Sequence, residues 1–306
     1  MEPVLSLKNV YKKIGRMQII NNVSFDVYPG EIFGFLGPNG AGKTTTIRMI
    51  VGLTNVTKGD ITISGQSIVH DFKKAIGHVG TIVENPEMYK YLSAEKNLIH
   101  FGRMSRNVIK EDIRKRLELV RLSHVKKQKV RKFSLGMKQR LGIAQAMLHS
   151  PDVLILDEPT NGLDPAGVRE MRDYLRRVAK EENVAILISS HLLSEIELIC
   201  DRFAIIQEGE IAKIENVKEE TEQTGHVSTF TLEVNERDRA RELVSDKFPS
   251  INVQFVENQL HLQATKDQMG EVITYLVENE IIVYQSILEK QSLEDRFFEV
   301  TNGGVS

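Results

Sequence analysis

A phosphate-binding pattern near the N-terminus constrains the fold of this chain more than any other stretch. Residues 37–44 read Gly-Pro-Asn-Gly-Ala-Gly-Lys-Thr and fit the pattern G-x-x-x-x-G-K-[ST]. The apolar run at residues 31–36 predicts a buried strand before the pattern, and Ile47, Ile50 and Val51 have helical spacing after it. A chance glycine-rich turn is the alternative interpretation, but the flanking strand and helix favour a nucleotide site.

Each residue type in this pattern has a physical reason. Glycines let backbone N–H groups curl around an anion, and the N-terminus of the following helix favours negative charge. Lys43 supplies a positive charge for the outer phosphates, where it would also assist catalysis, and the Thr44 hydroxyl can ligate Mg²⁺. The predicted nucleotide-binding residues of this stretch are Gly37, Pro38, Asn39, Gly40, Ala41, Gly42, Lys43, Thr44 and Thr45.

Length and cysteine content limit the remaining possibilities. A chain of 306 residues predicts two domains. We expect no secretion signal, and no apolar run approaches the roughly 18 residues needed to cross a bilayer. The one cysteine, Cys200, excludes an internal disulfide and a cysteine-built zinc site, which fits a reducing cytoplasm. Its helical spacing with Ile196, Ile199 and Phe203 predicts a core position.

Charge is unevenly distributed along the chain. From residue 216 onward there are 8 Lys and Arg against 17 Asp and Glu, whereas residues 103–140 hold 14 basic residues against 3 acidic ones. Such a basic segment could face nucleic acid or anionic lipid. The solvated face of amphipathic helices is the more common explanation, and we favour it.

The rest of the first two thirds alternates strands and helices. Strands are predicted at residues 4–10, 23–27, 59–65, 76–83, 152–158 and 184–188. Helical segments are predicted from Ser93 to about residue 123, with breaks, and at residues 141–148. This order predicts an α/β fold with a buried parallel sheet.

Polar residues end two of these predicted strands. Asp157 and Glu158 follow a buried run, at the strand end where a phosphate-loop protein holds its metal-binding aspartate. The second carboxylate is placed to polarise a water against the terminal phosphate. His191 follows the strand at 184–188, and open α/β sheets bind ligands at that edge. The alternative interpretation is that both carboxylates are simply solvent-exposed and that the histidine has no functional role.

The last third has a different pattern. Strands at 229–234, 253–256, 260–263 and 281–287 alternate with helices at 238–248 and 268–277, with Asn258 in the turn between two of the strands. This βαββαβ order predicts a small ferredoxin-like α+β domain. Residues 292–295 are predicted to cap a last helix that carries Phe297 and Phe298. No residue in this part looks catalytic, so a regulatory or dimer-supporting module and a plain structural appendage remain equal alternatives.

Taken together, these motifs resemble the ATP-binding subunit of an ABC transporter over essentially the whole chain. The resemblance implies a P-loop NTPase domain at residues 1–216, with a helical subdomain at about 86–150, and a C-terminal domain at 217–306. It implies that Asp157 supports Mg²⁺, that Glu158 is the catalytic base and that His191 is the switch histidine. Four further residues match an adenine-stacking aromatic, the signature motif and the D-loop, namely Tyr11, Ser134, Gly136 and Asp164.

Two departures from the family pattern stand out. The signature, usually Leu-Ser-Gly-Gly-Gln, reads Phe-Ser-Leu-Gly-Met at residues 133–137, and it keeps the serine and the second glycine. Where the family normally has a glutamine after the third strand of the domain, this chain has Glu84, followed by Asn85 and Pro86 and five residues before Tyr89. This acidic replacement resembles the subgroup that exports bacitracin and lantibiotics. We expect Glu84 to approach the metal when the dimer closes, and a loop carboxylate that stays in solvent is the alternative interpretation.

The resemblance implies an ATPase that drives a separate membrane-embedded permease. Two copies would sandwich two ATP molecules, each held by one chain's phosphate loop and by Ser134 and Gly136 of the other. The expected cargo is a peptide antibiotic, drug or lipid-like compound, and the expected location is cytoplasmic, peripheral on the inner face of the cell membrane. The alternative is a soluble ABC ATPase acting on nucleic acid or ribosomes. The sequence has one ATPase unit, one cysteine and no sustained heptads, so no nucleic-acid partner is expected.

Overall fold

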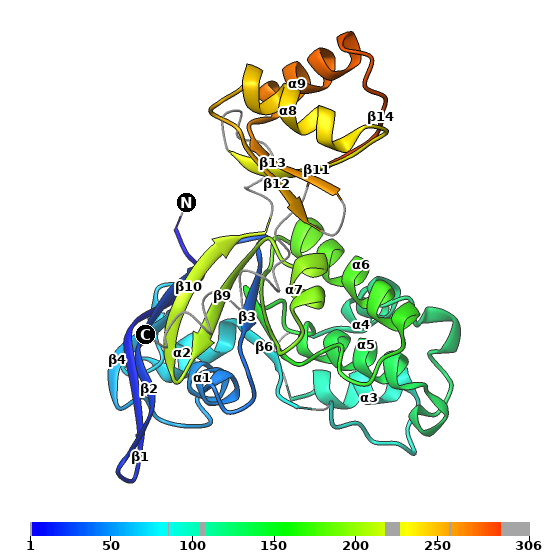
Figure 1. The fold of residues 1–306 in the computed structure, drawn as a ribbon. Coiled ribbons are helices and arrows are strands. Elements are labelled where there is room, and N and C mark those ends of the chain that lie inside the picture. The colour runs from blue at the N-terminus through cyan, green and yellow to red at the C-terminus, as the bar shows by residue number, and fades with distance from the viewer. Residues whose placement is uncertain (1, 85, 105–107, 218–226, 257–258, 289–306) are drawn as a thin grey trace. The chain divides into compact units, whose positions relative to one another are not determined.

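The computed structural model describes residues 2–84, 86–104, 108–217, 227–256 and 259–288 (Figure 1). These residues form two compact units, of which the first extends to Val217 and the second covers the described residues from 227 onward. The predicted turn at Asn258 and the predicted last helix at residues 292–298 lie outside the described residues. Within them, no helix combines the length and the apolar character needed to cross a membrane.

A six-stranded sheet forms the centre of the first unit, in the order β10-β9-β3-β8-β7-β6. All neighbouring pairs are parallel except β9 with β10. Its strands are β3 (Ile32–Leu36), β6 (Val79–Ile82), β7 (Val153–Asp157), β8 (Ala185–Ser190), β9 (Arg202–Gln207) and β10 (Glu210–Asn216). The predicted strand at 76–83 is shorter than expected, because Ile76–His78 form a 3₁₀ turn, η1. The expected parallel α/β sheet is confirmed.

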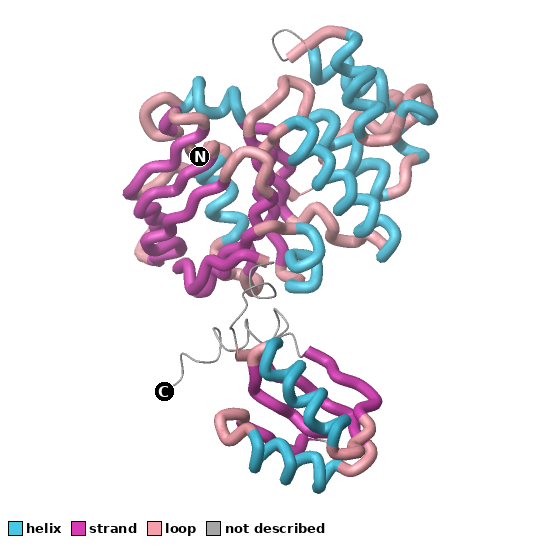
Figure 2. Tube along the Cα trace, turned by 90° about the horizontal axis from the view of Figure 1, so that it is seen from above, coloured by secondary structure: helices cyan, strands magenta, loops and turns pink. Residues whose placement is uncertain are grey.

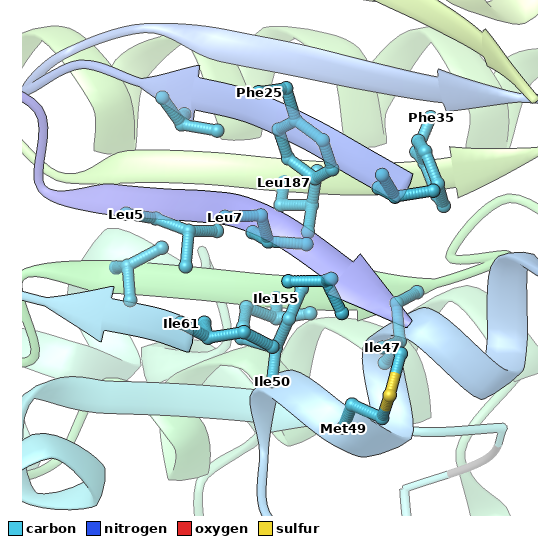
Figure 3. Packing of buried hydrophobic residues seen from close by; sticks show 14 of the residues in the cluster. Leu5, Leu7, Phe25, Phe35, Ile47, Met49, Ile50, Ile61, Ile155 and Leu187 are labelled. Atoms are coloured by element: carbon cyan, nitrogen blue, oxygen red, sulfur yellow. The ribbon is translucent and has the colours of Figure 1, made fainter. Parts of the chain in front are cut away.

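An antiparallel sheet packs against the central sheet. Its strands, in the order β2-β1-β4-β5, are β1 (Leu5–Ile14), β2 (Met17–Val27), β4 (Lys58–Ile63) and β5 (Gln66–Ser67). Side chains from both sheets and from α1 (Lys43–Ile50) meet in one apolar core, including Leu5, Leu7, Phe25, Phe35, Ile47, Ile50, Ile61, Ile155 and Leu187 (Figure 3). Burial of each such side chain contributes about 1.5–3 kcal/mol, which holds β3 and α1 rigidly on either side of the phosphate loop.

Most helices of the first unit lie on one side of its strands (Figure 2). They are α3 (Ala94–Gly102), α4 (Lys110–Leu119), α5 (Leu135–Ala146), α6 (Pro165–Glu182) and α7 (Leu193–Ile199). The first unit also contains the short elements α2 (Phe72–Ala75), η2 (Ser123–Val125) and η3 (Val130–Lys132). Ser93 caps α3, as its position predicted. The helix predicted at 141–148 begins six residues earlier, because the Ser134 hydroxyl accepts a hydrogen bond from the backbone N–H of Met137 and caps α5.

Cys200 is buried, so its predicted core position is confirmed. The predicted helical position of Phe203 is wrong. Cys200 has extended backbone and ends α7, and Phe203 lies on β9. Asp201 makes this change of direction possible, since its carboxylate accepts a hydrogen bond from the Ile32 N–H at 3.0 Å and fixes the start of β9 beside β3.

The second unit has the element order βαββαβ that the sequence predicted. Its elements are β11 (Ser228–Val234), α8 (Arg237–Lys247), β12 (Asn252–Val256), β13 (Gln259–Ala264), α9 (Lys266–Glu278) and β14 (Val283–Leu288). The sheet is antiparallel throughout, in the order β12-β13-β11-β14. Both helices cover one face of this sheet (Figure 1) and share an apolar core with it.

Candidate functional site

A cavity of about 750 Å³ opens where the phosphate loop meets the carboxyl ends of β7 and β8. The three strands meet there because β8 lies between β3 and β7, which places Leu36 beside Ser190 and Asp157 beside Ser189. The residues that line the cavity are Asn39, Gly40, Gly42, Lys43, Thr44, Thr45, Glu84, Gln139, Asp157, Glu158, Asn161, Gly162 and His191.

Two glycines of the phosphate loop are required by its geometry. Gly42 begins α1 with φ 113°, a conformation that favours glycine, and a Cβ there would come within 2.4 Å of Ile20 Cδ1. A Cβ on Gly37 would come within 2.4 Å of the Ile206 carbonyl oxygen. The loop therefore packs tightly against β2 and β9, and the N-terminus of α1 faces the cavity as an anion-binding end.

Lys43 is a buried cation at the floor of this cavity. Its Nζ donates to the carbonyl oxygens of Gly37 at 2.7 Å and Pro38 at 3.2 Å, and it lies 3.9 Å from Glu158 Oε1. Burial lowers the pKa of Lys43, and the carboxylates of Glu158 and Asp157 oppose that shift. The carbonyl oxygens carry only a partial negative charge. A bound phosphate would therefore interact more strongly with the Lys43 ammonium than they do.

Asp157 ends β7 and is almost fully buried. The Ser189 hydroxyl donates to Asp157 Oδ1 at 2.5 Å and accepts from the Glu158 N–H at 3.0 Å, so one serine orients the carboxylate and the backbone that follows it. Among the described residues, no cluster of three or more His, Cys, Asp or Glu side chains could hold a metal. Mg²⁺ keeps several waters and binds substrate phosphates, so Thr44 and Asp157, which line one cavity with oxygen donors, fit this ion.

Glu158 and His191 face each other across the end of the sheet. His191 Nδ1 lies 2.8 Å from Glu158 Oε2, and both side chains remain partly accessible, at 24% for Glu158 and 38% for His191. Glu158 also adopts a positive φ of 51°, which turns the chain away from β7 directly after Asp157. This pair can take a proton from a water and hold the resulting charge within hydrogen-bond reach.

Glu84 lines the cavity, but its described partner is a cation of the protein itself. Arg48 Nη2 on α1 lies 2.7 Å from Glu84 Oε1, and both side chains are largely solvent-exposed. An exposed ion pair of this kind contributes about 0–1 kcal/mol. The pair is therefore weak enough for Glu84 to exchange Arg48 for another partner.

Beyond the phosphate loop, four predicted site residues lie outside the cavity lining: Tyr11, Ser134, Gly136 and Asp164. The Tyr11 ring is faced by Lys58 Nζ at 5.2 Å from its centroid. Ser134 caps α5, and Asp164 caps α6 by accepting from the Gly167 N–H at 2.8 Å. Of the phosphate loop, Gly37, Pro38 and Ala41 do not line the cavity, although the first two hold Lys43.

The sequence prediction missed several residues of the site. Gln139, Asn161 and Gly162 line the cavity, and Gln139 is only 3% exposed. Ser189 and Ser190 were also missed, although two polar residues that end an apolar strand are a usable signal.

The strand, phosphate loop and helix, with two carboxylates and a histidine at the same sheet edge, define a P-loop nucleoside triphosphatase. Three comparisons then place the chain within that class. The model of the ABC transporter family matches residues 20–161. The uncharacterized ABC transporter ATP-binding protein YhcH of Bacillus subtilis (strain 168) is 50% identical over 301 residues, covering 98% of this chain and 97% of the relative.

A second relative is the bacitracin transport ATP-binding protein BcrA of Bacillus licheniformis. It is 39% identical over 305 residues, covering 99% of both chains. The solved structure of cbiO1 from Clostridium perfringens, part of the ABC transporter complex cbiONQ, matches with a TM-score of 0.66 and 26% identity, over 82% of this chain and 97% of that one. The chain belongs to the ATP-binding proteins of ABC transporters, and it is an ATPase. The family resemblance inferred from the motifs is confirmed.

Proposed function

We propose that this ATPase powers a separate membrane-embedded permease that exports a peptide antibiotic, drug or lipid-like compound. The observation that carries the ATPase part is the meeting of Lys43, Asp157, Glu158 and His191 in one cavity. The export part is supported by the similarity to BcrA, which extends over both compact units of the chain. The chain would then act at the inner face of the cell membrane, held there by its permease.

Hydrolysis follows from the cavity geometry. ATP binds with its phosphates over the loop, where Lys43 and the N-terminus of α1 balance their charge. Thr44 and Asp157 would hold Mg²⁺, which neutralises charge on the phosphates when bound. Glu158 accepts a proton from the attacking water. The water oxygen bonds to the terminal phosphorus, and ADP leaves. His191 holds Glu158 and contacts the terminal phosphate.

The residues outside the cavity support a composite site in a homodimer. Ser134 and Gly136 lie at the start of α5, and a Cβ on Gly136 would meet only Leu163 Cδ2, at 3.7 Å, so the backbone there is open to close approach. We infer that both residues, with Asp164, meet the terminal phosphate held by a second copy. Tyr11 would stack on adenine once Lys58 leaves its ring face.

We propose that the second unit is a ferredoxin-like module, in keeping with its strand order β12-β13-β11-β14 and its two helices on one face. We also propose domain limits of 1–216 and 217–306, close to the division after Val217, and a helical subdomain at about 86–150 that contains α3, α4 and α5. A role in regulation or dimer support and a purely structural role remain the two alternatives for this unit.

The rival function, action on nucleic acid or ribosomes, has less support. Several arginines and lysines of the basic segment 103–140 are already committed to acidic partners within the chain. The ion pairs that hold them are Glu111–Arg114, Arg116–Glu182, Glu95–Lys126 and Arg140–Glu170. This favours the solvated surface of the helices over a nucleic-acid footprint.

The test of the proposed function is Glu158→Gln, which keeps the shape of the side chain but removes the base. We expect ATP binding to persist, turnover to fall about 10²- to 10⁴-fold, and an ATP-bound dimer to accumulate on size exclusion. Glu181→Gln, at an exposed glutamate of α6, is the matched control. Normal hydrolysis by Glu158→Gln would refute the assignment of the base. If the protein purified from native membranes carried no membrane-spanning partner, the proposed pairing with a permease would be refuted.

A further inference from the structure

One carboxylate oxygen on α7 joins the two loops that carry Glu158 and His191. Glu195 Oε2 accepts a hydrogen bond from Thr160 Oγ1 at 2.5 Å and another from Ser190 Oγ at 3.0 Å. Both hydroxyl donors are almost fully buried, at 3% exposed for Thr160 and 1% for Ser190. The two hydroxyl groups are shielded from water, whereas Glu195 is half-buried, so the bonds are partly shielded and stronger than fully exposed contacts.

Each donor belongs to a tight turn around a residue of the hydrolytic pair. The turn after β7 is closed by the Asn161 N–H, which donates to the Glu158 carbonyl at 3.1 Å, and Thr160 lies inside it. The turn after β8 is closed by Ser190 Oγ, which accepts from the Leu192 N–H at 3.0 Å, with His191 as the residue between. A shift of either hydroxyl would thus move Glu158 or His191.

The acceptor itself is held firmly. Glu195 precedes Ile196, which is buried against β3 so closely that a Cβ on Gly34 would come within 2.9 Å of Ile196 Cδ1. Because α7 contacts the central sheet in this way, Glu195 is a fixed point relative to the phosphate loop. The turns that carry Glu158 and His191 are therefore both hydrogen-bonded to one side chain of a packed helix.

We propose that Glu195 is a positioning residue for ATP hydrolysis, which keeps Glu158 and His191 at their 2.8 Å contact by tying their two loops together. This inference rests on the proposed roles of Glu158 and His191. Glu195 is not among the residues that line the nucleotide cavity, so we expect its removal to affect the alignment of the pair and to leave phosphate binding intact. A loss of alignment of about 1 Å can cost on the order of 10²-fold in rate.

The alternative explanation is that Glu195 only stabilises α7. It lies in the first turn of that helix, where any negative charge is favourable. The two explanations predict opposite effects of two conservative variants. A tie needs an oxygen at the right reach, so Glu195→Gln, whose amide oxygen can accept both hydroxyl bonds, keeps function, whereas the shorter Glu195→Asp loses it. A helix charge is kept by Asp and lost by Gln.

The experiment measures kcat, KM and ATP affinity in the full chain for Glu195→Ala, Glu195→Gln and Glu195→Asp, with Glu197→Ala as the exposed control on the same helix. We expect Ala and Asp to lower kcat about 10- to 100-fold with ATP affinity unchanged, and Gln to stay within about 3-fold of the native chain. The combined loss in Glu195→Ala with His191→Ala should fall well below the product of the two single losses.

Three results would overturn the proposal: full activity in Glu195→Ala, activity kept by Asp but lost by Gln, or fully multiplicative losses with His191→Ala. Glu158→Gln is measured alongside. If Glu158→Gln hydrolyses ATP normally, the proposed role of Glu158 and His191 fails. If Glu158→Gln is inactive while the Glu195 variants give any of the three overturning results, only the positioning role of Glu195 fails.

Discussion

Ser189→Ala tests whether one buried hydroxyl organises the metal-binding end of β7. In the native protein this hydroxyl donates to Asp157 Oδ1 at 2.5 Å and accepts from the Glu158 N–H at 3.0 Å. Ser189 is fully buried and Asp157 is 4% exposed, so solvent does not readily replace the lost donor. The substitution therefore removes a hydrogen bond to a buried carboxylate without changing the backbone.

The expected cost follows from these contacts. A hydrogen bond to a charged group contributes about 1.5–3 kcal/mol to the free energy of unfolding. Loss of the hydrogen bond from the Glu158 N–H costs less free energy, because this N–H also donates to the Ser189 carbonyl at 3.2 Å. We expect a loss of about 2 kcal/mol, which lowers Tm by about 4–8 °C for a unit of this size.

Calorimetry on the nucleotide-free chain measures this effect as a change in Tm. Ser194→Ala is the matched control, since Ser194 is exposed and its hydroxyl forms no hydrogen bond among the described residues. We expect that control to stay within about 0.5 kcal/mol of the native protein. Equal Tm values for Ser189→Ala and Ser194→Ala would refute the role assigned to the hydroxyl.

Two further predictions concern the dimer and the acidic loop. Gly136→Asp should leave ATP binding to the single chain nearly intact but block closure by like charge against the terminal phosphate, and mixing it with Lys43→Ala should restore one working composite site per heterodimer. No nucleotide-driven pairing in that mixture would contradict a shared site. Glu84→Ala should raise the Mg²⁺ concentration needed for half-maximal hydrolysis and reduce antibiotic tolerance of cells, and Glu84→Gln should alter transport more than basal hydrolysis. If both variants behave like the native protein, while Arg48→Ala does so too, Glu84 is an exposed loop residue paired only with Arg48.

The phosphate loop could be predicted from the sequence because its geometry is local. Contiguous residues 37–44 form the anion-binding turn from their own backbone, and the apolar runs on either side specify a strand and a helix. Asp157, Glu158 and His191 were also predictable, since residues that follow buried parallel strands meet at one edge of a sheet. The βαββαβ order of the last third was readable for the same reason, because alternating and helical periodicities mark each element separately.

Only the tertiary structure decided which distant side chains touch. The order β3-β8-β7 brings residues 37–44, 157–158 and 189–191 together, although their order along the chain differs from their order in the sheet. Hydrogen bonds such as Thr160–Glu195 and the ion pair Arg48–Glu84 join residues 35 and 36 positions apart, and no local pattern specifies such a distance. The apolar periodicity of a sequence determines which faces are buried, whereas the packing of those faces selects the polar partners at the edge of the sheet.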